Sequence, residues 1–336
     1  MKKALFWLKR TGIGLAAVVI IIVPASLWLW QDRPSIDALR LQSTEITETG
    51  AFGVKVTWLG STTLLFDDDE TQILIDGFVS RPGVLDIVFR RPIESDAATI
   101  NYVMDEFRVR RLAAIIPVHS HYDHAMDVGA IANRSSAAVV GTESTANIAR
   151  GAGVPDEQII LVTNGDTLEF GKFTVTFITS RHVPNGVGDG HLIAGFMSEP
   201  LKQPAEFTAW REGGSWSILI SHPLGTTLVQ GSAGFIDEAL ADTQADVVMM
   251  SVAGLTSQGR KYTRDYWHQV VEPTGATRVF VLHYDDFTQP FGQTKLFPTS
   301  VDNVVASVQW LDALAKASDR GIDILRPTFG EPAILY

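Results

Sequence analysis

The stretch LAAIIPVHSHYDH, residues 112 to 124, decides how this chain folds and what it can bind. It opens on an apolar run that is short enough for a buried strand. It then places three of the chain's eight histidines and one aspartate within six residues. Extended backbone directs His119 and His121 the same way, whereas Asp123 and His124, at the expected start of the next helix, turn toward a second position. Imidazole and carboxylate are the donors that zinc takes when thiolate is lacking, and catalytic zinc sites keep one position for water.

Length and composition describe a globular protein without thiol chemistry. The 336 residues suffice for one large domain or two small ones. A formal net charge of -11 disfavours sequence-independent binding of nucleic acid, because such binding relies on lysine and arginine to neutralise phosphates. The chain has no cysteine, so any metal must be held by histidine and carboxylate. We therefore expect no nucleic-acid partner.

The N-terminus is predicted to be a membrane anchor. Four basic residues precede the uncharged run Thr11–Trp30, and about 20 such residues span a bilayer as a helix. A cleaved signal peptide is the alternative, but its apolar core is usually roughly 7 to 15 residues long and ends in small residues. The run here ends in Trp28 and Trp30, which suit a membrane interface. The preceding basic residues predict a single-pass protein of the inner membrane, with its folded domain periplasmic or extracellular.

We expect three segments: a cytoplasmic tip and transmembrane helix over residues 1–30, a linker over 31–50, and a folded domain over 51–336. Alternating or apolar runs predict strands at 54–59, 62–66, 72–75, 112–118, 138–141, 159–162, 173–179, 217–221, 227–230, 247–252 and 279–283. Helical patterns cover 36–41, 99–110, 235–240 and 301–316. Strands in both halves with helices between them suggest two packed sheets covered by helices.

The segment His119–Asp127 resembles the histidine motif of the metallo-β-lactamase superfamily. Within that superfamily it is similar to the branch that contains the phospholipase-D-type hydrolases of N-acyl phosphatidylethanolamine and the sugar-lactone hydrolases. Trp58–Gly60 and Ile73–Asp76 resemble the opening of the same branch, and the resemblance extends over about residues 54–290. It implies an α/β fold, a four-layer αββα sandwich preceded here by the N-terminal helix, and the activity of a zinc-dependent hydrolase.

The resemblance also implies where the metal ligands lie. The family has a further histidine after a later strand, and we assign it to His182 rather than His191 because His182 directly follows a predicted strand. His283, at the end of the last predicted strand, matches the final ligand. One zinc would then be held by His119, His121 and His182, and the other by Asp123, His124 and His283. His222 and His268 match no motif, and we expect them to be structural.

Two positions depart from the family's pattern. Ser232 stands where the family usually has the aspartate that bridges two metals, in Gly231-Ser232-Ala233-Gly234 instead of Gly-Asp-Thr-Gly. Ser61 stands where this branch often has histidine. Because the bridging carboxylate is missing, the number of zinc ions that the site holds, one or two, remains open.

Four more residues are candidates for supporting roles. Asp76 would be the family's structural aspartate beside the metals. Tyr284 and Asp286, which follow the last ligand, are candidates for hydrogen bonds to the ligands. Arg181, next to His182, is a candidate for contact with an anionic substrate.

The chemistry expected of such a site is hydrolysis by metal-bound hydroxide, with Asp123 orienting the nucleophile. Zinc lowers the pKa of a bound water from about 15.7 to about 7, which supplies hydroxide at neutral pH. A lipid-type phosphodiester is the favoured substrate, and a lactone or β-lactam is the alternative. A redox di-iron enzyme is disfavoured, because that branch typically carries glutamate at the position of His121. A degenerate metal-binding module without turnover stays open because of Ser61 and Ser232.

Overall fold

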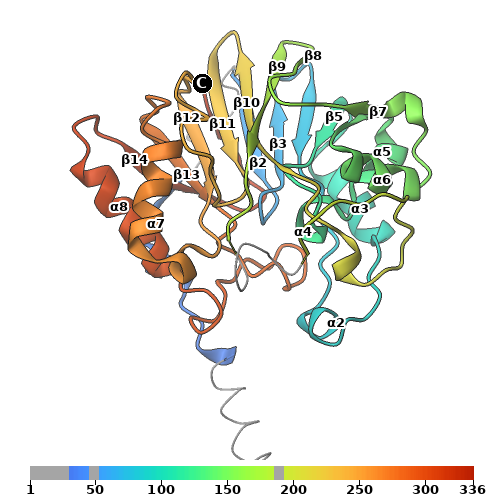
Figure 1. The fold of residues 1–336 in the computed structure, drawn as a ribbon, viewed down its shortest axis with the longest axis horizontal. Helices are drawn as coiled ribbons and strands as arrows, with labels where there is room; N and C mark the ends of the chain where they lie inside the picture. The colour runs from blue at the N-terminus through green and yellow to red at the C-terminus, as the bar shows by residue number, and fades with distance from the viewer. Residues whose placement is uncertain (1–29, 45–52, 185–192) are drawn as a thin grey trace, which may run out of the picture.

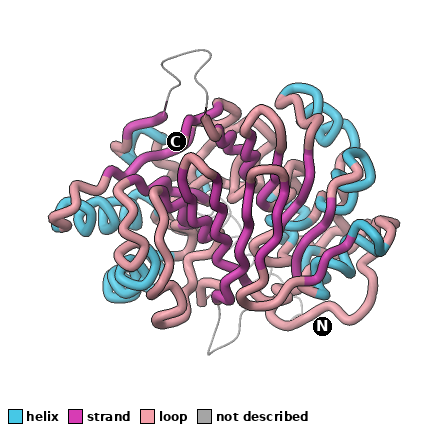
Figure 2. The backbone as a smooth tube through the Cα atoms, turned by 90° about the horizontal axis from the view of Figure 1, so that it is seen from above, coloured by secondary structure: helices cyan, strands magenta, loops and turns pink. Residues whose placement is uncertain are grey.

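The computed structural model of the protein describes residues 30–44, 53–184 and 193–336. Two sheets face each other at the centre, and helices cover both outer sides (Figure 1). Seen from above, the strands form the middle of the molecule and the helices lie at its two flanks (Figure 2). The described residues thus form the mixed α/β sandwich that the sequence predicts.

The larger sheet has eight strands in the order β1-β14-β13-β12-β11-β10-β9-β8. β8 to β11 pair antiparallel, while β11 to β14 and β1 pair parallel. Its strands are β1 (Gln42–Thr44), β8 (Thr167–Phe170), β9 (Phe173–Ser180), β10 (Ser215–His222), β11 (Gly225–Gln230), β12 (Val247–Ser251), β13 (Arg278–Leu282) and β14 (Asp323–Pro327).

The smaller sheet has seven strands in the order β15-β2-β3-β4-β5-β6-β7. It opens as an antiparallel meander of β2, β3 and β4 and continues with parallel strands from β4 to β7. Its strands are β2 (Lys55–Trp58), β3 (Leu64–Asp67), β4 (Gln72–Ile75), β5 (Leu112–Ile116), β6 (Ala138–Gly141), β7 (Ile159–Leu161) and β15 (Pro332–Ile334).

The helices pack on the outer faces of the two sheets (Figure 1). α7 (Leu255–Val270) and α8 (Val304–Ala317) cover the larger sheet, and α3 (Ala97–Glu106), α5 (Val128–Ser135) and α6 (Glu143–Gly151) cover the smaller one. The short elements are α2 (Val84–Val88), α4 (Tyr122–Ala125) and the 3-10 turns η1 (Ile36–Leu39), η2 (Asp156–Gln158) and η3 (Phe207–Ala209).

The alternation of side chains along β4 separates two hydrophobic cores. Ile73 and Ile75 point between the sheets, into the core that also contains Phe177 of β9. Leu74 points the other way, into the core formed with Ile100 of α3. Because successive side chains of a strand point to opposite faces, a strand buried on both faces is mostly apolar, as β4 is from Ile73 to Ile75.

One predicted helix is wrong, and one begins later than predicted. Residues 235–240 form turns, in which Glu238 has a φ of 61° and the amide of Ala241 bonds the carbonyl of Glu238. A left-handed residue cannot continue a right-handed helix. The last helix begins at Val304, because the Asn303 side chain caps it by accepting from the amide of Ala306.

The predicted anchor, residues 1–30, lies outside the described residues except for Trp30. Among the helices that are described, none is both long and apolar enough to cross a bilayer.

Candidate metal centre

The histidine motif follows the end of β5, where the chain leaves the smaller sheet. The amide of Val118 donates to Asp76 Oδ1 over 2.8 Å, which fixes the strand end against the loop after β4. His121 then occupies the N-cap position of α4, so Asp123 and His124 lie in the first turn of that helix. The end of β5 and the start of α4 thereby carry four of the predicted ligands.

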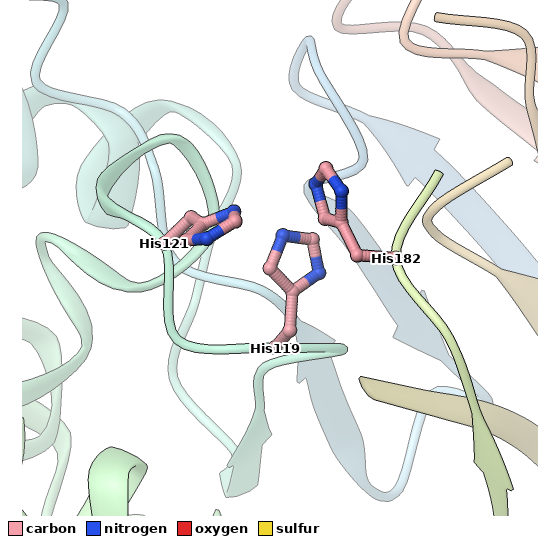
Figure 3. Close-up of side chains that lie close together, drawn as sticks. All are labelled: His119, His121 and His182. Carbon is pink, nitrogen blue, oxygen red and sulfur yellow. The ribbon is translucent and has the colours of Figure 1, made fainter. Parts of the chain in front are cut away.

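His119, His121 and His182 form the first cluster. One ligand nitrogen from each lies within 4.8 Å of the others, and Figure 3 shows the three imidazoles turned toward one another. The ring centroid of His119 lies 4.6 Å from that of His121 and 4.8 Å from that of His182. His182 arrives from the end of β9 in the opposite sheet, so this cluster joins the two halves of the sandwich.

Asp123, His124 and His283 form the second cluster, again with ligand atoms within 4.8 Å of one another. Asp123 Oδ2 lies 3.4 Å from His283 Nε2 and 3.7 Å from His124 Nε2. Although burial opposes ionisation, the nearby His124 and His283 hold the pKa of the Asp123 carboxyl well below its usual value. The rings of His124 and His119 are 3.9 Å apart, so the two clusters adjoin.

His119 shows that the first cluster fits a metal ion. Both of its ring nitrogens are buried and have no hydrogen-bond partner, which is costly for an imidazole unless an ion takes the lone pair. Burial and the neighbouring imidazoles lower the pKa of His119 well below its usual value, so the ring is neutral. A neutral imidazole is the form that binds metals. In the second cluster, His283 Nδ1 is likewise buried without a partner.

Asp76, the predicted structural aspartate, lies beside His124, a predicted ligand of the second cluster. Its buried carboxylate lies 2.8 Å from His124 Nδ1 and accepts a short hydrogen bond from the hydroxyl of Thr62. A carboxylate on Nδ1 leaves Nε2 of the same ring for the metal. Asp76 itself has a φ of 60°, a strained value for a residue other than glycine. The sequence offered no signal for the role of Thr62.

Ser232 lies at the site without serving as a carboxylate. It lines a cavity of about 160 Å³ together with Asp123, His182 and His283. Its hydroxyl accepts a hydrogen bond of 3.0 Å from the amide of Val183, the residue after His182. Ser232 therefore fixes the backbone that carries a ligand from the first cluster.

Ser61 also lies at the site, beside the second cluster. Its hydroxyl is 3.4 Å from His283 Nε2 and donates to the carbonyl of Asp123 over 3.3 Å. Its amide donates to Asp285 Oδ1 over 2.8 Å, and Asp285 in turn faces the buried Arg81 at 3.5 Å. Sequence reasoning missed Asp285 and Arg81, because contacts between residues so far apart in the chain leave no local pattern.

Tyr284 and Asp286 direct their side chains elsewhere, which differs from the prediction that they bond the ligands. The hydroxyl of Tyr284 donates to the carbonyl of Pro327 over 3.0 Å. The carboxylate of Asp286 pairs with Arg33 at 2.6 Å and accepts from Thr288. His283 has a φ of 57°, so the chain turns at this ligand, and nearness in sequence was a poor guide to which side chains face it.

Arg181 is exposed and lines a cavity of about 310 Å³ next to the first cluster. His182 lines both this cavity and the smaller one that contains Ser232, so the two spaces meet at a predicted ligand. The alternative ligand His191 lies outside the described residues. His222 and His268 lie apart from both clusters, paired with Asp68 at 3.5 Å and Glu272 at 2.6 Å, respectively.

The sequence was compared with family models and with curated proteins. No protein-family model matches the chain. A UPF0173 metal-dependent hydrolase of Methanopyrus kandleri is 28% identical over 143 residues, which are 42% of this chain and 53% of that protein. The chain thus matches about half the length of this curated relative.

Two solved structures are similar to this chain. CmlA, a diiron beta-hydroxylase from Streptomyces venezuelae, has a TM-score of 0.51 at 13% identity, covering 86% of this chain and 55% of that one. The metallo-beta-lactamase fold protein YhfI from Bacillus subtilis has a TM-score of 0.47 at 14% identity, covering 83% and 98%. At such identities the likeness concerns the fold alone. The histidine motif, the two-sheet sandwich with its paired clusters and the relative from Methanopyrus kandleri together support the resemblance to the metallo-β-lactamase superfamily.

Proposed function

We propose that this protein is a hydrolase that depends on zinc bound by the two clusters. The observation that carries the proposal is His119, whose buried ring nitrogens have no hydrogen-bond partner at the point where both clusters meet. Five imidazoles and one carboxylate make up the two groups, and this donor set suits zinc in a chain without cysteine. One ion would be held by His119, His121 and His182, and the other by Asp123, His124 and His283.

Zinc in this position would lower the pKa of a water molecule to about 7 and so supply hydroxide at neutral pH. The residues around it have separate tasks. Asp123, ionised and facing His283 at 3.4 Å, would orient the attacking water. Asp76 holds the ring of His124 in one orientation. The backbone amide of Val183, bonded to Ser232, keeps the loop after His182 in place.

The ligand atoms of the two clusters also argue against a di-iron redox enzyme. The likeness to a diiron hydroxylase concerns the fold alone, and His121 contributes a nitrogen where that branch typically has glutamate. Among the described residues, the two clusters hold only one carboxylate, Asp123. Sites rich in imidazole nitrogen favour zinc and hydrolysis, whereas the di-iron enzymes use sites richer in carboxylate.

A phosphodiester of lipid type is the substrate class that we propose. The cavity beside His182 offers an exposed cation, Arg181, for a phosphate, and it offers Phe235 and Tyr262 for apolar groups. Arginine suits phosphate oxygens because its planar guanidinium donates in pairs. The uncharged run Thr11–Trp30 supports the same choice, because it would keep the enzyme beside its lipid.

The proposed placement follows from that run and its basic flank. Thr11–Trp30 would cross the inner membrane once, with the four preceding basic residues in the cytoplasm. The folded domain would then be periplasmic or extracellular. This leaves the metal centre on the outer side of the membrane.

A substrate screen tests the proposed activity. The purified full chain, loaded with zinc, is assayed against phosphodiester, lactone, thioester and β-lactam reporters, with His121→Ala as the inactive control. We expect the phosphodiester to be hydrolysed fastest. Faster hydrolysis of the lactone or β-lactam would overturn the substrate class while keeping the hydrolase. Equal background rates for wild type and His121→Ala on every reporter would overturn the hydrolase itself.

A further inference from the structure

Helix α2 presents an apolar stripe to solvent. Leu85, Val88 and Phe89 are 55%, 65% and 66% exposed, and they recur with the spacing of one helical face. Single exposed apolar residues are common, but large side chains gathered on one face usually mark an interaction site.

The helix that carries the stripe is attached to the fold on its other side. On the opposite side of the helix, Ile87 packs against the core beneath α3 and α5. The chain that follows is fixed at Ile93, which is 5% exposed and exchanges backbone hydrogen bonds of 2.8 and 3.1 Å with Ala205. Because these contacts lie on one side of α2, the apolar stripe on its other side is available to a partner.

The start of the described chain is fastened to the loop that follows the second metal cluster. Arg33 pairs with Asp286 at 2.6 Å and donates to the carbonyl of Leu296 over 2.8 Å. The amide of Thr299 donates to the carbonyl of Asp32 over 3.1 Å. These bonds fix the position of Asp32 and Arg33, which follow the uncharged run in the sequence.

The same loop reaches α2. Thr288 and Pro290 line a cavity of about 540 Å³ together with Gly83 and Asp86 of the α2 region. Figure 1 shows α2 and the blue start of the described chain at the same end of the molecule. Phe287, in this loop, also lines the cavity that contains His283. The exit of the N-terminal run, the apolar stripe and the metal centre are therefore connected through one loop.

Charge at the stripe suits a lipid surface. Exposed Arg90 and Arg91 follow it directly. The Arg91 guanidinium lies 5.7 Å from the ring centre of Phe89 and 3.4 Å from the carboxylate of Asp86. Interfacial helices combine apolar side chains that enter the lipid with basic side chains at the headgroups. Basic residues gain further from anionic headgroups.

We infer that Leu85, Val88 and Phe89 insert into the surface of the same membrane that the N-terminal run enters. The inference rests on the proposed anchor, and it adds a second point of contact that fixes the orientation of the domain. Two contacts hold the end of the sandwich that carries the metal centre against the lipid. The proposed lipid substrate would then reach the centre without leaving the membrane surface.

The absence of cysteine makes a direct test possible. Val88→Cys and, as a matched control, Leu224→Cys are made in the full chain; Leu224 is 56% exposed in the turn between β10 and β11. Each cysteine is labelled with a polarity-sensitive fluorophore, and the protein is reconstituted into vesicles of phosphatidylglycerol and phosphatidylcholine with or without spin-labelled acyl chains. Leu85→Cys serves as a second site on the stripe.

We expect the spin-labelled lipid to quench about half or more of the emission at positions 85 and 88, because an interfacial helix lies roughly 5–10 Å into the lipid. Position 224 should keep its emission. Protein that floats with the vesicles but shows equal, weak quenching at all three positions would overturn the inference and leave the anchor standing. Protein that does not float would overturn both. Neither readout requires metal or turnover, so a failed substrate screen remains a separate result.

Discussion

At the scale of single residues, the pairing of Asp76 with His124 would determine how firmly the second cluster binds a metal ion. The carboxylate lies 2.8 Å from Nδ1 and fixes the ring that would present Nε2 to the metal. Outer partners of this kind are worth roughly 10- to 100-fold in metal affinity. The pair therefore offers a test of the ligand set that leaves every ligand in place.

We predict that Asp76→Asn lowers zinc affinity by about 10- to 100-fold, because an amide cannot match the carboxylate on Nδ1. Asparagine tolerates the left-handed backbone at this position, so the fold should persist. Asp68→Asn is the matched control, since Asp68 is also buried and paired with a histidine, His222, away from the clusters. Competition with a coloured chelator measures both variants. Equal losses in the two variants would show that Asp76 acts on the fold rather than on the metal.

Ser232 stands where a carboxylate could bridge the two proposed ions. It lines the cavity that contains Asp123 and His283, and its side chain is short and uncharged. We predict that Ser232→Asp tightens binding of the second zinc, because a carboxylate would face both clusters. Ser232→Asn has the same size without the charge and should bind zinc as wild type does. If zinc titration gives the same second affinity for both variants, Ser232 does not occupy the bridging position.

At the scale of elements, the sequence predicted most strands, because fully buried strands read as apolar runs and half-buried strands as an alternation of apolar and polar residues. β4 and β6 have the predicted ends, and β9 extends the predicted range by one residue. The helix at 235–240 failed since its turn conformation depends on Glu238, whose positive φ no periodicity reveals. Propensity is a weak guide where tertiary contacts decide.

The candidate site was predictable to a similar extent. The histidine motif marks its own position, and His182 and His283 each follow a strand that the apolar pattern reveals. Tyr284 and Asp286 were misjudged because sequence neighbours of a ligand need not face it. Asp285 reaches Ser61 from 224 residues away, and such a contact exists only once both sheets have formed.

The backbone at Gly234 approaches the backbone that follows β9 closely, so a larger side chain at this position should not fit. A Cβ there would lie 2.1 Å from the carbonyl oxygen of Arg181 and 2.6 Å from the carbonyl carbon of His182. We predict that Gly234→Ala displaces the end of β9, costs about 1–3 kcal/mol of unfolding free energy and weakens zinc binding. Gly83→Ala, where the nearest atom is the end of the Asp86 side chain at 3.3 Å, should change neither by much. Wild-type zinc affinity in Gly234→Ala would mean that His182 is not held by this contact.

At the scale of the whole molecule, the proposed anchor predicts how the protein behaves in cells. The uncharged run Thr11–Trp30 is long enough for about 30 Å of hydrocarbon at 1.5 Å per residue. Membrane association should therefore resist a high-salt wash and yield only to detergent. Protease added to spheroplasts should remove the domain while sparing a cytoplasmic control. A domain protected in intact spheroplasts would reverse the orientation, and a soluble mature chain beginning near residue 31 would indicate a cleaved signal peptide.

The two adjoining clusters make metal content the quantity on which the account depends. Each cluster supplies three ligand atoms within 4.8 Å of one another, so each is expected to hold one ion. A ligand removed from either cluster should cost that ion and the hydrolytic activity before it costs the fold. His268, exposed and paired with Glu272, belongs to neither cluster.

The most direct test is the zinc content of the purified full chain, measured together with hydrolysis of a phosphodiester reporter. We predict two zinc ions per chain in wild type and in His268→Ala, matching the two clusters. His121→Ala and His283→Ala should each lose an ion and lose more activity than the roughly 10- to 100-fold effect of an outer-partner change. Circular dichroism should show both variants folded. A His121→Ala protein that keeps both ions and its wild-type hydrolysis would contradict the account.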